Sequence, residues 1–421
     1  MNTITWMMCV LMIGFCALSG PALAGEMTND ELMRELKAVK NRVQQLERML
    51  KERGTGDPQE GPARDIPEFE RIRSENERIG KELETVGKEQ RDMRSMLEQV
   101  MDRVTINGIV EVEASYEKPG KKSGKNEESS DITLATAQIE FDARVHELVN
   151  AHLILLWEED DTGPVDIDEG TITLGATPEM PWFLLAGKFY PPFSTFDTFF
   201  ISDPLTLEIG EIRESAASVG YSGDWLFASF GGFNGDVSSE ENDHINNLIV
   251  NVDFFNPEGT WSGFRLNTGV GFLFNMADTD TLQEETAVDT LKDAIPGVAA
   301  HATLGYGDFQ LIAEYVTALS DFEAGELGFA VLDGEAREAR PSAWNLELGY
   351  GFLEKFQLAA RYEGSHRLYG LRPKFNVGGV FGWELYSGVT LSLEYLHGEF
   401  DENDEGLDSR DAFTTQLALE F

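Results

Sequence analysis

From Thr105 onward the sequence repeatedly alternates apolar and polar residues with a period of two. In Trp344–Phe352, for example, one parity is aromatic or aliphatic, whereas Asn345 and Glu347 fall on the other. Alternate residues of a strand point to opposite faces, so each run has one apolar and one polar face. Runs of about ten such residues are typical of a transmembrane β-barrel. About sixteen antiparallel strands are predicted over 105–421, starting near residues 105, 132, 150, 166, 182, 211, 224, 246, 261, 296, 308, 343, 355, 373, 388 and 413.

The run Phe413–Phe421 also has one apolar face and ends on an aromatic residue. It resembles the C-terminal assembly signal of bacterial outer-membrane barrels, although an ordinary half-buried edge strand has the same pattern. Alternation alone also fits a soluble β-sandwich or adhesin on a stalk. Charges on the polar parity and aromatic residues near strand ends favour the barrel. Those aromatic residues are Trp157, Trp182, Trp225, Trp261, Trp344 and Trp383.

Residues 1–24 have the pattern of a secretory signal peptide. Trp6–Leu18 is apolar, and Ala22-Leu-Ala24 fits the small-x-small cleavage pattern, which predicts a mature chain starting at Gly25. The segment departs from the pattern in having no Lys or Arg before the apolar run. An uncleaved anchor is disfavoured because the apolar run is short for a membrane span.

Between the signal peptide and the strands, residues 25–104 predict an N-terminal α-helical coiled coil, placed in the periplasm. Two blocks, 26–53 and 68–104, carry apolar residues at heptad spacing, and the Gly- and Pro-rich segment 54–67 between them predicts a hinge. The a positions are Leu36, Val43, Leu50, Asn76, Leu83, Gln90 and Leu97, and the d positions are Leu32, Val39, Leu46, Ile72, Ile79, Val86, Met93 and Val100. Leu at a positions together with β-branched residues at d positions favours a coiled coil of three or four helices, so a homotrimer is predicted. Two amphipathic helices packed on a domain are the alternative.

The amino-acid composition and motif content argue against several classes of function. Both cysteines, Cys9 and Cys16, lie in the predicted signal peptide, so the mature chain has no disulfide and no thiol chemistry. A net charge of −42 argues against a nucleic-acid partner. None of the six His pairs at a spacing such as HxxxH, and no catalytic motif is present, so no cofactor, no metal site and no enzyme activity are predicted.

The acidic residues are concentrated in the predicted barrel. Residues 105–421 hold 17 of the 33 basic and 56 of the 75 acidic side chains. Much of this charge lies in the predicted outer loops, which are 118–131, 234–245, 276–295, 318–342 and 400–412. The favoured interpretation is a solvated face that binds outer-membrane lipid and lipopolysaccharide through divalent cations. The alternative is a mouth that concentrates cations. Both disfavour an anion-selective pore.

The stretch 187–218 differs most from a plain strand-and-turn pattern. Pro191-Pro192, four Phe residues and an acidic and basic cluster follow one another in it. A segment this aromatic is expected to fold against the barrel wall or into the lumen as a constriction, and a loop packed on a neighbouring subunit is the alternative. The candidate lumen or constriction residues are Arg144, Lys188, Tyr190, Phe193, Phe196, Asp203, Glu208, Glu211, Arg213, Glu214, Arg265, Glu347 and Arg361. On the same polar parity, Glu140, Glu314, Glu363 and Glu394 are also expected to line the lumen.

Here the sequence resembles the siderophore porins typified by the legiobactin receptor. The resemblance rests on the signal peptide, the heptads, the switch to strands at Val104–Ile109 and the block GKxYxPF…ISDPLTLExGExRESA at 187–216. It implies passive uptake of a small solute, an iron–siderophore, through an outer-membrane barrel. No binding residue is carried over from that family.

The sequence therefore predicts an outer-membrane porin with a lumen narrowed by residues 193–214. The alternatives are a general cation-preferring porin and a structural outer-membrane anchor whose coiled coil reaches the cell wall.

Overall fold

The computed structural model describes residues 103–122, 127–159, 165–239, 244–401 and 406–421, together with nine separate positions between Ser74 and Ser95. All nine of those positions are helical, as expected for the block 68–104. The chain divides into two units, Met1–Glu89 and Gln90–Phe421. The predicted signal peptide, the hinge and the heptad seam apart from Met93 lie outside the described residues.

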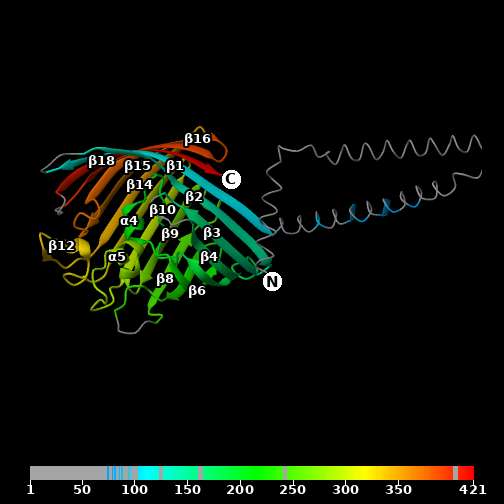
Figure 1. Ribbon diagram of the computed structural model, residues 1–421, viewed down its shortest axis with the longest axis horizontal. Helices are drawn as coiled ribbons and strands as arrows, with labels where there is room; N and C mark the ends of the chain where they lie inside the picture. The colour runs from blue at the N-terminus through cyan, green and yellow to red at the C-terminus, as the bar shows by residue number, and fades with distance from the viewer. Residues whose placement is uncertain are drawn as a thin grey trace, which may run out of the picture. The chain divides into compact units, whose positions relative to one another are not determined.

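Residues from Val104 onward form a closed antiparallel barrel of sixteen strands (Figure 1). The predicted number and orientation of the strands are thereby confirmed. The barrel strands are β1 (Val104–Lys121), β2 (Ser129–His146), β3 (Val149–Trp157), β4 (Asp166–Gly175), β5 (Trp182–Phe189), β6 (Glu214–Ser222), β7 (Leu226–Phe233), β8 (Asn247–Phe255), β9 (Phe264–Leu273), β10 (Gly297–Tyr306), β11 (Phe309–Ala318), β14 (Ser342–Phe352), β15 (Phe356–His366), β16 (Phe375–Tyr386), β17 (Val389–Glu399) and β18 (Leu407–Glu420). Each strand pairs with its neighbour in sequence, and β18 pairs with β1 to close the barrel.

The closing strand begins earlier than the sequence predicts, at Leu407 rather than at residue 413. Residues 408–411 are all polar and show no alternation, but they pair with β1 in register up to Gly120↔Ser409, and after a register shift the last pair is Lys121↔Leu407. Phe421 continues the pairing, because its backbone N–H and C=O bond to the C=O and N–H of Gly108 at 3.0 and 2.9 Å. A Cβ at position 108 would lie 2.3 Å from the Phe421 ring, so a larger residue there would require this ring to move.

The barrel has an apolar outside and a polar inside. On β14, Leu346 and Leu348 are exposed, whereas Asn345 and Glu347 are buried. Outward-facing rings form a chain of contacts near the short turns, which includes Trp225–Trp261 and Phe356–Trp383 at centroid distances of 6.1 and 5.9 Å. An apolar belt with aromatic rings at its edge is the surface that a lipid bilayer covers.

The connections at the two ends of the barrel differ. The turn end carries the short connections, such as 147–148, 307–308 and 387–388, and the loop end carries the long ones. The long connections contain short elements: α4 (Leu205–Gly210), η1 (Met276–Asp278), α5 (Asp280–Glu284), η2 (Gly328–Ala330) and the hairpin β12 (Val331–Leu332) with β13 (Glu335–Ala336). Among the described residues, no helix is long and apolar enough to cross a membrane.

An apolar core lies at the loop end of the barrel. It joins side chains of the β5–β6 connection, such as Phe193 and Ile209, to Leu282 and Phe322 of the other long connections. The long connections therefore pack on one another, and the β5–β6 connection is held between them and the barrel wall.

Candidate functional site

The connection between β5 and β6, residues 190–213, folds into the barrel and is called the inner loop here. Its helix α4 contacts β11, β14 and β15, and Figure 1 shows α4 among the barrel strands. The approach to the wall is close. At Gly271 on β9 an added Cβ would lie 1.6 Å from the carbonyl oxygen of Phe193, and at Gly349 on β14 it would lie 2.5 Å from the Phe199 ring. The wall carries glycine where the loop backbone or an aromatic ring needs space.

Four buried carboxylates on separate strands bind the inner loop. Glu347 on β14 accepts the Thr198 hydroxyl and the Phe199 N–H, both at 2.9 Å. Glu394 on β17 accepts the N–H groups of Ile201 and Ser202 at 2.6 and 3.1 Å, and Glu363 on β15 accepts the Leu205 N–H at 2.8 Å. Glu314 on β11 accepts the Thr206 hydroxyl. These hydrogen bonds join the loop to four separate strands and so fix its path.

Arg361 on β15 completes this anchor from the middle of the carboxylates. Its guanidinium pairs with Glu347 at 2.9 Å and Glu363 at 3.7 Å, and the side chains of all three residues are at most 1% exposed. The same guanidinium donates to the Ser202 hydroxyl and to the carbonyls of Ser202 and Asp203. It also lies over the Phe200 ring at 4.2 Å. One buried cation therefore satisfies both the wall carboxylates and the loop carbonyls.

Both ends of the inner loop bind β4, and Ser194 binds β10. Arg213 forms an ion pair with Asp168 at 2.9 Å, and the Tyr190 hydroxyl donates to the same carboxylate at 2.9 Å. Lys188 reaches the carbonyl of Ile167 at 3.0 Å. On the far wall, Ser194 hydrogen-bonds to His301 at 3.1 Å. The loop thus crosses the barrel interior from β4 and β5 to β10–β17.

The structure separates the candidate residues into two groups. Most belong to the inner loop or its anchors: Lys188, Tyr190, Phe193, Phe196, Asp203, Glu208, Glu211, Arg213, Glu347 and Arg361. Glu214 is the first residue of β6. Arg144 on β2 and Arg265 on β9 lie instead towards the turn end, where Arg265 makes a 3.5 Å contact with the Gly307 carbonyl.

Five residues expected to line an open lumen are covered by the inner loop. Glu314, Glu347, Arg361, Glu363 and Glu394 are no more than 5% exposed. Their polar parity was visible in the sequence, but their burial follows from the path of the loop. Five further anchors were not predicted from the sequence, because they carry no signal beyond their polarity: His301, Asp168, Thr198, Ser202 and Thr206.

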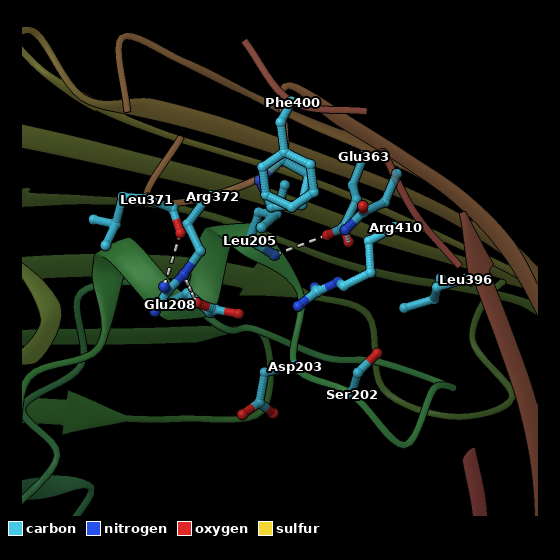
Figure 2. A pocket seen from close by; sticks show the side chains of 12 residues that line it. Ser202, Asp203, Leu205, Glu208, Glu363, Leu371, Arg372, Leu396, Phe400 and Arg410 are labelled. Atoms are coloured by element: carbon cyan, nitrogen blue, oxygen red, sulfur yellow. Dashed lines mark hydrogen bonds and ion pairs between the residues drawn. The ribbon is translucent and has the colours of Figure 1, made fainter. Parts of the chain in front are cut away.

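A cavity of about 280 Å³ lies beside the inner loop at the loop end of the barrel (Figure 2). It is bordered by Ser202, Asp203 and Glu208 of the loop and by the wall from β15 to β18. Its two arginines are already paired, Arg372 with Glu208 and Arg410 with Glu117, the latter at 3.7 Å. The cavity is lined by both polar and apolar side chains, and its positive charges are largely neutralised.

The part of the barrel wall formed by β1 is acidic. The inner face of β1 carries Glu111, Glu113 and Glu117 in succession, since the apolar residues between them face outward. Glu113 accepts the Gln416 amide at 2.9 Å. Within the part of the chain that the structure describes, Glu111, Glu113 and Asp203 form no ion pair within 4.0 Å. Burial raises the pKa of Asp203, Arg361 lowers it, and Glu394 and Glu111 raise it further. The field of the β1 wall therefore reaches the inner loop.

Glu211 adds a titratable group to the inner loop near neutral pH. Burial is the largest cause that raises its pKa, to about 7, and repulsion from Asp280 adds to it. Its backbone also joins the loop to α5, because its carbonyl accepts the Asp280 N–H at 3.0 Å. The charge of this part of the loop changes between pH 6 and 8.

No protein-family model matches the chain. Among curated proteins it is similar to a UPF0422 protein of Coxiella burnetii, with 24% identity over 70% of this chain and 64% of that protein. A UPF0422 protein of Legionella pneumophila is 23% identical over 70% of this chain and 59% of its own length. The chain spans about three fifths of the length of these relatives.

Solved structures with the same fold are outer-membrane channels and porins. The outer membrane channel DcaP of Acinetobacter baumannii matches with a TM-score of 0.52 and 16% identity, over 75% of this chain and 97% of that one. Pseudomonas putida OprB matches with a TM-score of 0.55 and 10% identity, over 78% and 97%. The anion-selective porin from Comamonas acidovorans matches with a TM-score of 0.54 and 12% identity, over 76% and 99%. The chain has the sixteen-strand barrel fold of these porins.

Proposed function

We propose that this protein is a passive channel of the bacterial outer membrane that prefers small cationic solutes. The observation that carries the proposal is the inner loop, which folds into the barrel against β11, β14 and β15 and would narrow the lumen beside the acidic face of β1. Solved structures of the same fold are channels and porins. One of them is described as anion-selective, so the preference of this chain is argued from its own charges.

The preference for cations follows from the distribution of charge around the inner loop. The arginines beside the inner loop are already ion-paired: Arg361 with buried carboxylates, Arg213 with Asp168 and Arg372 with Glu208. Among the residues that the structure describes, Glu117 pairs with Arg410, and the other acidic groups on the inner face of β1 have no basic partner within 4.0 Å. A passage lined by carboxylates with low-dielectric walls concentrates cations and repels anions.

The proposal also includes the transported solute and the assembly of the N-terminal region. An iron–siderophore is the solute that the resemblance to siderophore porins implies, and the acidic wall favours a neutral or cationic chelate over an anionic one.

The heptads of 25–104 would form a periplasmic coiled coil in a homotrimer. Met93, a predicted d residue, is 63% exposed in the single chain, as a seam residue without its partners would be. Cross-linking of the purified protein that yields only monomer would contradict the trimer.

The test is the reversal potential of the purified protein in a planar bilayer under a tenfold KCl gradient. The expected sign is that of a cation-preferring pore. The double variant Glu111→Gln and Glu113→Gln is expected to lower the cation-to-anion permeability ratio several-fold. Glu258→Gln is the matched control, because Glu258 is an exposed carboxylate in the turn between β8 and β9. It should leave the ratio unchanged.

An anion-preferring wild-type pore, or a ratio that the double variant leaves unchanged, would contradict the proposed preference. A folded barrel that conducts no ions would favour the structural anchor instead.

A further inference from the structure

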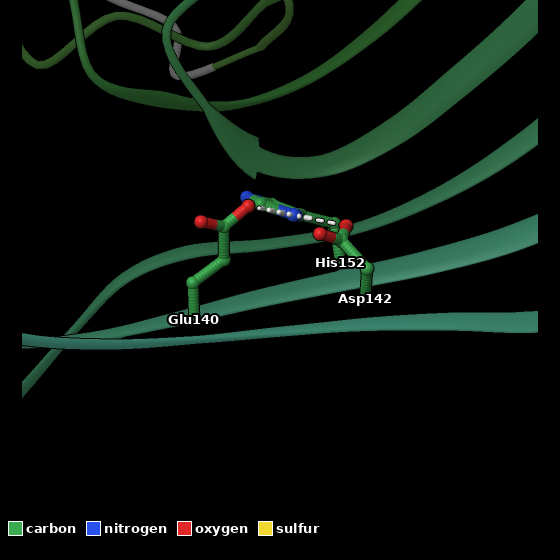
Figure 3. A group of neighbouring side chains, drawn as sticks. All are labelled: Glu140, Asp142 and His152. Atoms are coloured by element: carbon green, nitrogen blue, oxygen red, sulfur yellow. Dashed lines mark hydrogen bonds and ion pairs between the residues drawn. The ribbon is translucent and has the colours of Figure 1, made fainter. Parts of the chain in front are cut away.

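A histidine and two carboxylates meet on the inner face of β2 and β3 (Figure 3). Glu140 and Asp142 are two residues apart on β2 and so share a face, and Asp142 is the cross-strand partner of His152. The three potential ligand atoms lie within 4.8 Å of one another. No function described above uses this cluster. From this geometry we propose that the barrel binds a divalent transition-metal cation, of the Zn²⁺ class, between Glu140, Asp142 and His152.

The spacing of the ligand atoms matches that of a coordination shell. His152 Nδ1 lies 2.8 Å from Asp142 Oδ1 and 3.6 Å from Glu140 Oε1. With metal–ligand bonds of about 2.1 Å, adjacent ligands are about 3.0 Å apart in an octahedral shell and about 3.4 Å apart in a tetrahedral one. The two observed distances bracket these values. A cation can therefore take the place of the proton on Nδ1 with only small movements of the side chains.

The surroundings orient the ligands. Asn107 on β1 donates its amide to Oε2 of Glu140 at 3.3 Å, which leaves Oε1 directed towards His152. Outer contacts of this kind position the ligands of metal sites. In the strand register, Ile154 lies between Glu140 and Glu169, so Glu169 of β4 adds negative charge to the same wall. Arg144 follows Asp142 on that face and opposes part of this field.

The ligand types select the cation. Imidazole together with carboxylates suits zinc and related transition metals, whereas magnesium and calcium prefer oxygen ligands alone. The His152 and Glu140 side chains are 26% and 28% exposed and that of Asp142 is 48% exposed. The site is thus open to solvent, and water would complete the shell, so the bound cation should exchange readily.

The structure also provides a matched control pair. His397 on β17 and Asp411 on β18 are cross-strand partners with the same Nδ1–Oδ1 distance of 2.8 Å. Asp411 is occupied by the Tyr395 hydroxyl as well. Within the described residues, the cluster of Glu140, Asp142 and His152 alone has three potential ligands. A His–Asp pair by itself should bind zinc much more weakly.

The test is calorimetric titration of the tag-free, detergent-solubilised protein with ZnCl₂ at pH 7. One Zn²⁺ per chain is expected. His152→Ala and Asp142→Asn should each weaken binding at least tenfold, and His397→Ala should leave it unchanged. Asp142→Asn is nearly isosteric and serves as the readout if His152→Ala fails to fold.

Three outcomes would overturn the proposal. They are no binding of Zn²⁺ up to millimolar concentration, wild-type affinity in both site variants, and binding of Mg²⁺ as strong as that of Zn²⁺. The titration does not depend on conductance, so the site and the channel are tested separately.

Discussion

Replacement of Arg361 by Met removes the centre of the inner-loop anchor while it keeps most of the side-chain volume. The guanidinium lies between Glu347 and Glu363 and donates to Ser202 and Asp203 of the loop. In the variant, both wall carboxylates would be buried without their cation, and the loop carbonyls would lose their donor. Both effects favour an inner loop that leaves the wall.

The expected size of the effect follows from the burial of the pair. Arg361 and Glu347 side chains have no exposed surface, and removal of one partner of a buried ion pair costs about 3–5 kcal/mol. With about 4 kcal/mol lost and each 1.4 kcal/mol worth a factor of ten, the ratio of seated to unseated loop falls roughly a thousand-fold. The barrel itself should stay closed, because backbone pairing between neighbouring strands, including β18 with β1, closes it.

Single-channel recording in a planar bilayer measures this change. Arg361→Met should give larger and noisier currents than the wild type, as the loop leaves the wall and returns. Arg361→Lys keeps the charge but loses the planar guanidinium with its several donors, so currents intermediate between those of the wild type and Arg361→Met are expected. Arg265→Met is the control, because Arg265 makes only a long contact with Gly307 and none with the loop in the described chain. Records of Arg361→Met that match those of the wild type and of the control would refute this account of the anchor.

Two further predictions concern the seating and the charge of the inner loop. Gly271→Ala places a Cβ 1.6 Å from the Phe193 carbonyl oxygen. The clash should displace the loop from the wall at a cost of about 1–3 kcal/mol, which single-channel recording would detect as current noise. Gly382→Ala is the control and should behave as the wild type, because the nearest atom to its added Cβ is 3.7 Å away. Burial, with Asp280, raises the pKa of Glu211 from 4.5 to about 7, so the folded chain keeps this proton where the unfolded chain has lost it. Stability should therefore fall as pH rises from about 4.5 to about 7, and cation preference should increase between pH 6 and 8. Glu211→Gln should reduce both pH dependences without abolishing them, because burial also raises the pKa of Glu214 to about 7; an unchanged profile in that variant would contradict the assignment.

The sequence predicted the barrel well because its physical signal is local. Alternation with period two is imposed on every strand that separates lipid from a polar interior, as at Leu346, Glu347 and Leu348. Fifteen predicted strand starts lie within three residues of those observed, whereas that of β18 is six residues late. Residues 408–411 of β18 are polar on both faces and are extended because β1 and β17 pair with them. Such pairing cannot be predicted from the pattern of apolar and polar residues.

The site was less visible, because it depends on register and on the path of a loop. The aromatic stretch was recognised as a segment that folds inward or against the wall. Its anchors come from β4, β10, β11, β14, β15 and β17, and their common level in the barrel is set by the stagger of the strands. Cross-strand partners such as Asp142 and His152 are likewise invisible to a search for ligands at helical spacing.

Single-channel conductance of the purified protein, with and without residues 193–204, tests the central claim most directly. The account predicts steady channels that favour cations in the wild type. It also predicts a larger conductance with weaker cation preference after the deletion, because the deletion removes Asp203 and the part of the inner loop that narrows the barrel. A folded wild-type barrel without conductance, or a deletion that changes neither conductance nor selectivity, would contradict it.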